Sequence, residues 1–304
     1  MLAKAKNNLL WEALLIALII ALQIPAAAKS EELKVLTGIT PVWSLAANVM
    51  KGTSATPDVL VKGSVSPHDY ALKPSDAQKI KDADIIFMLS PEFETFMAKP
   101  ALQKQKQNQG KVVFLADTKD LTLWPVKDSP ELTDMHIWLD TENAAKMVQM
   151  MALTLAEKDW KNAPVYIKNA NETIGRLRKL SASTGKTLEK VKAVPFFVYH
   201  NAWQYFVKQN GLNMAEAVLL DEDSFPGIKR KLYLKNLVVE KGIKCLFVDA
   251  WLNDDKAAKL AADLGVKVKE VDPLGANIKG GAPATYYFTM MKDAAAAYKD
   301  CLEN

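Results

Sequence analysis

The sequence predicts an α/β protein with two four-stranded, mainly parallel lobes joined by a long, rigid backbone helix. Short runs of β-branched and aromatic residues alternate with helical stretches in residues 29–160 and again in residues 193–304. This alternation is typical of parallel sheets covered on both faces. Between the two regions, residues 161–192 hold no strand candidate and are rich in Lys, Leu, Ala and Glu. That stretch predicts a single helix longer than most globular helices, acting as a strut between two domains.

The first lobe is predicted from four short apolar runs that alternate with segments whose apolar residues recur at helical spacing. The runs predict strands at residues 33–37, 58–61, 85–89 and 111–116. Apolar residues at helical spacing predict helices at residues 42–52, 75–84, 91–107 and 142–157. Pro100 is expected to break the third helix, because proline lacks the amide donor that a helix interior needs.

The second lobe repeats the alternation. Strands are predicted at residues 194–199, 217–220, 244–249 and 266–271, and helices at residues 201–211, 232–242, 254–265 and 283–302. Pro195 fits near the start of its strand, where a missing amide donor is tolerated.

Residues 1–28 predict a secretory signal peptide. Lys4 and Lys6 precede an apolar run at residues 13–22, which is shorter than the roughly 20 residues that span a bilayer. Pro25 and three alanines then supply a cleavage site. An uncleaved N-terminal anchor is the alternative, because Glu12 lies close to the apolar run. Export without a cysteine at the cleavage site to carry lipid predicts a freely soluble protein of the periplasm.

Charge and cysteine content narrow the classes of function. The formal charge of the 304-residue chain is +4, and removing the signal peptide takes away two lysines and one glutamate, which leaves +3. No dense basic block is present, so nucleic-acid binding is not expected. The two cysteines, Cys245 and Cys301, predict a disulfide in an oxidising compartment, with two buried free thiols as the alternative.

All three histidines of the chain fall where this fold places ligand groups. His68 lies in the loop after the second strand, His200 directly follows the strand at residues 194–199, and His136 precedes the helix at residues 142–157. Asp272 ends the last strand. Ligands of open parallel sheets bind beyond the carboxyl ends of the strands, and imidazole nitrogen with one carboxylate oxygen suits tetrahedral zinc. The pattern predicts a metal site made by His68, His136, His200 and Asp272.

Three histidines with an open water position would also suit a secreted zinc hydrolase. Against this stands the lack of a recognisable general base. Asp69 and Asp134 lie near the predicted ligands in sequence, but a sequence neighbour is more often solvated or a support for the ligand.

Four motifs resemble those of the periplasmic metal-binding proteins of bacterial ABC transporters, specifically the zinc branch of the zinc/manganese cluster. The motifs are GSVSPHDYALKPSDAQKIKDADIIF, DMHIWLDTENA, FFVYHNAWQYFVKQNGL and VDPLGANIKGGAPATYYFTMM. They occur in order and cover nearly the whole mature chain. The resemblance implies two α/β lobes, a backbone helix, and a metal between the lobes held by His68, His136, His200 and Asp272. It also implies a disulfide between Cys245 and Cys301 that ties a strand to the last helix.

The resemblance further implies capture of Zn²⁺ and its delivery to an inner-membrane ABC permease, by a monomer that is not an enzyme. Manganese, alone or together with zinc, is the alternative cargo, although the manganese branch generally has glutamate where His200 stands. Water or another carboxylate is the alternative to Asp272 as fourth ligand. A surface adhesin is a third class, disfavoured because no cysteine can carry a lipid anchor. Residues 117–134 are short and contain no histidine, whereas many zinc members carry a histidine-rich loop there.

Overall fold

The structure, a computed structural model, describes residues 32–303 apart from 63–64, 128, 220–224 and 253–254. The predicted signal peptide lies outside the described residues. The chain from Leu33 onward forms one compact unit. Within the described part of the chain, no helix has both the length and the apolar character needed to cross a membrane.

The first sheet has the strand order β2-β1-β3-β4, and all neighbours are parallel. Its strands are β1 (Val35–Ile39), β2 (Pro57–Val61), β3 (Ile85–Met88) and β4 (Lys111–Phe114). The helices of this part are α2 (Thr40–Met50), α3 (Pro74–Asp82), α4 (Thr95–Lys106) and α5 (Thr141–Lys158). The four predicted strands are confirmed. The predicted break at Pro100 is wrong: α4 continues through it, at the cost of one amide donor to the preceding turn.

The second sheet has the order β10-β9-β7-β8 and is also parallel throughout. Its strands are β7 (Phe196–Val198), β8 (Met214–Ala217), β9 (Cys245–Asp249) and β10 (Lys267–Val271), and its helices are α7 (Gln204–Asn210), α8 (Ile228–Lys241), α9 (Asp255–Leu264) and α10 (Tyr286–Glu303). Strand β8 begins three residues before its predicted position. Its position is determined by pairing with β7, of Met214 with Phe196 and of Ala217 with Val198, rather than by the apolar run on which the prediction relied.

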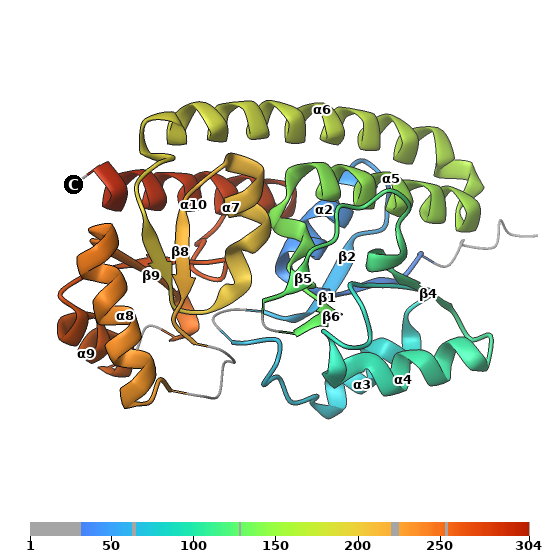
Figure 1. Ribbon diagram of the computed structural model, residues 1–304. Coiled ribbons are helices and arrows are strands. Elements are labelled where there is room, and N and C mark those ends of the chain that lie inside the picture. The colour runs from blue at the N-terminus through green and yellow to red at the C-terminus, as the bar shows by residue number, and fades with distance from the viewer. Residues whose placement is uncertain (1–31, 63–64, 128, 220–224, 253–254, 304) are drawn as a thin grey trace, which may run out of the picture. The chain divides into compact units, whose positions relative to one another are not determined.

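A single long helix, α6 (Ala163–Leu188), runs between the two sheets in sequence. Its buried residues recur every three or four positions, from Tyr166 through Thr173 and Leu180 to Leu188, and so form one stripe along the helix. This stripe packs on helices from both halves of the chain, namely α2, α5, α7 and α10. Figure 1 shows α6 passing over α5 at one end and reaching toward α10 at the other. The predicted long helix is therefore present.

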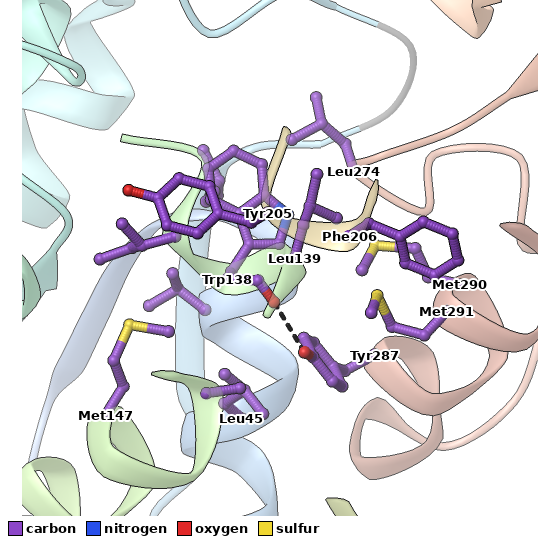
Figure 2. Close-up of a cluster of buried hydrophobic side chains, with 14 of the residues drawn as sticks. Leu45, Trp138, Leu139, Met147, Tyr205, Phe206, Leu274, Tyr287, Met290 and Met291 are labelled. Carbon is purple, nitrogen blue, oxygen red and sulfur yellow. Dashed lines mark hydrogen bonds between the residues drawn. The ribbon is translucent and has the colours of Figure 1, made fainter. Parts of the chain in front are cut away.

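The hydrophobic core has a shared centre and two outer parts. The outer parts lie under α3 and α4 at the first sheet and under α8 and α9 at the second. The central cluster takes residues from both halves, including Trp138 and Met147 from the first and Leu274 and Tyr287 from the second. Figure 2 shows these side chains together, with the Tyr287 hydroxyl donating a hydrogen bond to the Trp138 carbonyl at 2.6 Å. The two sheets are thus joined by packing as well as by α6.

A small antiparallel hairpin, β5 (Pro125–Val126) and β6 (Ser129–Thr133), was not predicted. It occupies the histidine-free segment at residues 117–134 and is tied to α7. The Trp124 amide donates to the Tyr205 hydroxyl at 3.0 Å, and Gln204 Nε2 donates to the Pro125 carbonyl at 3.1 Å. The hairpin is too short and too polar to show a period in the sequence.

The disulfide between Cys245 and Cys301 is present, which confirms that prediction. It joins the start of β9 to the end of α10 and therefore fixes the terminal helix to the second sheet.

Candidate metal centre

The three histidines come from three separate segments. His68 lies in the loop between β2 and α3, His136 lies just before the short 3₁₀ turn Ile137–Leu139, and His200 follows β7 by two residues. Between 68 and 200 the chain passes through most of the first half and all of α6. Only the fold brings these residues together.

The imidazoles converge on one point. The three histidines each offer a ring nitrogen, and these nitrogens all lie within 4.8 Å of one another. Ring centroids are 5.2 Å apart for His136 and His200, 6.1 Å for His68 and His136, and 6.2 Å for His68 and His200. Ligands of a tetrahedral zinc ion at about 2.0–2.1 Å are about 3.3–3.4 Å apart. Placing one ion among them requires movements of only about 1 Å.

His136 is backed by a buried aspartate two residues earlier. Its Nδ1 lies 2.7 Å from Asp134 Oδ1, which also accepts the His136 amide at 3.0 Å. The other oxygen of Asp134 accepts from Gln204 Nε2 at 2.9 Å. Burial acts to raise the pKa of Asp134, but His136 and these hydrogen bonds outweigh it and hold that pKa below its ordinary value. Asp134 therefore stays ionised at neutral pH.

His200 is backed by a buried aspartate from another strand. Its Nδ1 lies 2.8 Å from Asp249 Oδ2, and the second oxygen of Asp249 accepts from Trp203 Nε1 at 2.8 Å. Strands β7 and β9 are neighbours, and Val198 pairs with Phe247. His200 and Asp249 each follow these paired residues by two positions, so the sheet register itself brings them together.

The two aspartates determine which nitrogen faces the centre. Each aspartate also accepts a hydrogen bond on its other oxygen, from Gln204 or Trp203. As the acceptor, it leaves the Nδ1 of its histidine as the donor that carries the proton. The Nε2 then presents a lone pair, as a metal ligand must. The side chains of His136 and His200 are only 11% and 12% exposed, whereas His68 is the exposed member of the group. Two ligands are thus held in position before any ion arrives.

Asp272, the fourth predicted ligand, is not part of the group of three. Its Oδ1 accepts the Leu274 amide at 3.0 Å and its Oδ2 accepts the Asn277 amide at 2.8 Å. Burial raises the pKa of Asp272, the three backbone amides that it faces lower it, and the charge of Asp249 raises it further. The net shift is upward. The loop of Asp272 is tied to the first half of the chain, because Trp138 Nε1 donates to the Pro273 carbonyl at 2.8 Å.

Three supporting residues were missed in the sequence. Asp249 and Gln204 are distant in sequence from the histidines that they support, and Phe93 lies between two glutamates at the start of a predicted helix. The Phe93 ring lies 4.9 Å from the His68 ring and 5.4 Å from the His136 ring. Only Asp134, two residues before His136, could have been found from sequence spacing.

Known proteins resemble the chain in both sequence and fold. The family described as "Zinc-uptake complex component A periplasmic" matches residues 35–301. The "High-affinity zinc uptake system protein ZnuA" of Brucella abortus (strain 2308) is 30% identical over an alignment of 312 positions, gaps included. The alignment covers 88% of this chain and 91% of that protein.

Two solved structures share the fold. A crystal structure of ZnuA has a TM-score of 0.77 at 21% identity, and covers 89% of this chain and 99% of its own. The solute-binding protein FpvC from Pseudomonas aeruginosa, in complex with Mn²⁺, has a TM-score of 0.76 at 18% identity, and covers 90% of this chain and 99% of its own. At these identities the likeness is one of fold alone.

Proposed function

Because the chain belongs to the family of periplasmic zinc-uptake components, we propose that it captures Zn²⁺ and delivers it to the permease of an ABC transporter. The observation that carries this proposal is the convergence of His68, His136 and His200, whose ring nitrogens lie within 4.8 Å of one another. Three neutral imidazoles bind zinc well. The carboxylates of Asp134 and Asp249, behind His136 and His200, offset the charge of a dication in a poorly solvated site.

Zinc is favoured over manganese by the donor set. The three converging ligands are all imidazole nitrogens, so the donor set stays mostly imidazole even with one carboxylate as a fourth ligand. Imidazole favours Zn²⁺, whereas added carboxylates favour Mn²⁺. The fold does not decide between the metals, since the Mn²⁺-bound FpvC shares it.

The fourth position is proposed for Asp272. Its carboxylate is already oriented by backbone amides, and a bound cation would favour its charged form. A water molecule is the competing ligand. Measuring zinc affinity for Asp272→Asn separates the two, because only a directly bound carboxylate should cost more than the range of about 10–100-fold seen for supporting groups.

The use made of the two buried carboxylates argues against a hydrolase. Both oxygens of Asp134 accept hydrogen bonds, from His136 and Gln204. Both oxygens of Asp249 accept as well, from His200 and Trp203. Each carboxylate instead orients a histidine from the Nδ1 side of its ring, away from the Nε2 side on which a metal-bound water would lie. The protein is therefore proposed to bind and release the ion without chemistry.

We propose that the two lobes move little relative to each other when Zn²⁺ is released. The lobes are residues 29–160 and 193–304. Helix α6 contacts elements of both halves, and the central core cluster takes residues from both. We propose that the exported chain acts as a monomer after removal of residues 1–28. With a modest formal charge of +4 in the full chain, it does not bind nucleic acid.

Zinc titration of the metal-free protein tests the proposal. Competition against a chelator of known affinity should show one tight zinc ion per chain and weaker manganese binding. An ordinary histidine has a pKa of about 6.5, and binding requires neutral imidazole. Zinc affinity should therefore fall when the pH drops from about one unit above that value to about one unit below it. Equal affinities at the two pH values would count against a histidine site.

A further inference from the structure

A buried carboxylic acid follows Phe93, whose ring lies against two of the three histidines, and is not used by the proposed site. Glu94, directly before α4, is 0% exposed. Its Oε2 accepts the Leu89 amide at the end of β3, and its own amide donates to the Ser90 carbonyl at 3.0 Å. Its Oε1 has no hydrogen-bond partner among the described residues. Burial raises the pKa of Glu94 to about 8, against the opposing bonds from Leu89 and Ser90, so the group is neutral at pH 7.

The space for this carboxyl is made by a glycine in β1. A Cβ added at Gly38 would overlap Glu94 Oε1 and lie 3.2 Å from Met97 Sδ. The backbone of Gly38 is not in the left-handed region, so the glycine is needed for room rather than for conformation. Glu94 therefore fits against β1 with no space left over.

Glu94 closes the short turn that carries Phe93. Its side chain accepts a hydrogen bond from the amide of Leu89, the first residue of the turn, and its own amide donates to the carbonyl of Ser90, the second. The Phe93 amide donates to Ser90 Oγ at 3.2 Å. Phe93 is 4% exposed, and its ring lies edge-on to His68 at 4.9 Å, to His136 at 5.4 Å and to Trp138 at 5.5 Å. The turn thus presents one aromatic ring to two of the three histidines.

We propose that Glu94 is a positioning residue of the three-histidine site and acts through Phe93. With the turn closed, the Phe93 ring limits the rotamers of His68, the most exposed of the three histidines, and keeps its nitrogen near those of His136 and His200. Aromatic edge contacts of this kind stabilise a fixed ring geometry. This role rests on the proposed function, because the histidines are positioned to bind Zn²⁺.

The test compares zinc affinity in matched variants, each measured on folded protein by chelator competition, with thermal unfolding recorded separately. Glu94→Ala should weaken zinc binding about tenfold, the lower end of the range for groups that support a ligand. Glu94→Gln, which keeps the shape and neutrality, should stay within about twofold of the wild type. Glu92→Ala, an exposed neighbour, is the control and should not change the affinity.

Two double variants test whether the effect passes through Phe93 and the Gly38 contact. Phe93→Ala should also cost about tenfold, and adding Glu94→Ala to it should cost nothing more, because contacting residues that act as one unit are not additive. Gly38→Ala should weaken zinc binding alone but not in the Glu94→Ala background, where the overlapping oxygen is gone.

The outcomes separate this proposal from the one on which it rests. Folded Glu94→Ala protein that binds zinc like the wild type would overturn the positioning role, as would losses from Phe93→Ala and Glu94→Ala that simply multiply. Should Glu94→Ala not fold, Phe93→Leu keeps the apolar volume and should still weaken binding about tenfold; unchanged affinity there would likewise overturn the role. A wild-type chain that binds no zinc would contradict the proposed function itself, and this proposal with it.

Discussion

Two aspartate–histidine pairs hold the centre of this protein, and they are built in different ways. The Asp134–His136 and Asp249–His200 contacts measure 2.7 and 2.8 Å, and both histidine side chains are nearly buried. The first pair spans two residues of one loop, whereas the second spans 49 residues and two neighbouring strands. The same chemical arrangement can thus come from a local turn or from sheet register. Only the local version leaves a pattern in the sequence.

The largest expected effect follows from removing either histidine of these pairs. His136→Ala and His200→Ala should each weaken zinc binding by more than roughly 100-fold, beyond the range for supporting residues, because each deletes a ligand. If the pairs are equivalent in function, the two losses should be similar by chelator competition. A large loss in one variant and none in the other would break the comparison.

The next effect distinguishes the pairs. An asparagine side chain has one acceptor end and one donor end. In Asp249→Asn, the donor end must face either His200 Nδ1–H or the Trp203 indole N–H, both of which donate, so one of the two hydrogen bonds is lost. Asp134→Asn can keep its acceptor on His136 and turn its amide to Gln204. A flip of the Gln204 amide then provides an acceptor at the cost of its bond to the Pro125 carbonyl, but no bond to a histidine is lost.

We therefore expect Asp249→Asn to weaken zinc binding about 10–100-fold and Asp134→Asn to weaken it less. Isothermal titration at pH 7 measures both variants under one condition. Equal losses would show that the adaptable partner at Asp134 makes no difference.

A third prediction contrasts these two aspartates with Glu94. The folded-state pKa of Glu94 is raised to about 8 from an ordinary value of about 4.3. The folded protein therefore binds this proton more tightly than the unfolded chain, and its stability falls as the pH rises between those two values. Glu94→Gln removes the titration and should gain a few kcal/mol on the wild type between about pH 4.5 and 8. Thermal unfolding across this range checks it, and parallel curves for the two proteins would contradict it.

The smallest effect on the metal centre is expected at the disulfide. Replacing Cys245 and Cys301 with alanine removes a crosslink over a sequence separation of 56 residues, worth about 4 kcal/mol of unfolding free energy in the chain-entropy model. Zinc affinity should change by no more than about twofold, as for independent sites. Denaturant unfolding and chelator competition on the same variant test both parts. A large loss of affinity would mean that the terminal helix helps to shape the centre.

Much of the fold could be predicted because apolar runs mark buried parallel strands. The runs at residues 85–89 and 244–249 coincide with β3 and β9, and the stripe of α6 is periodic enough to find. Strand β8 begins before its predicted position because pairing with β7, rather than local apolarity, determines where it lies. The β5–β6 hairpin carries too few apolar residues to show a period, and α4 tolerates Pro100 because one missing donor does not end a helix.

The candidate site was predictable only in part. The positions of the three histidines at element ends were visible in the sequence, as was Asp134 beside His136. Asp249 was invisible, since its partner is fixed by the alignment of β7 with β9. Phe93 and Glu94 looked like ordinary residues at the start of a helix, because their role depends on contacts with Gly38 and His68 that no local pattern records.

The most direct test of the central claim is a crystal structure of the zinc-loaded protein with anomalous data collected on both sides of the zinc edge. The account predicts one strong anomalous peak, about 2.0–2.1 Å from Nε2 of His136, Nε2 of His200 and one ring nitrogen of His68. The Nδ1 atoms of His136 and His200 should still be bonded to Asp134 and Asp249, respectively. A peak elsewhere in the chain, or coordination through Nδ1 of His136 or His200, would contradict it.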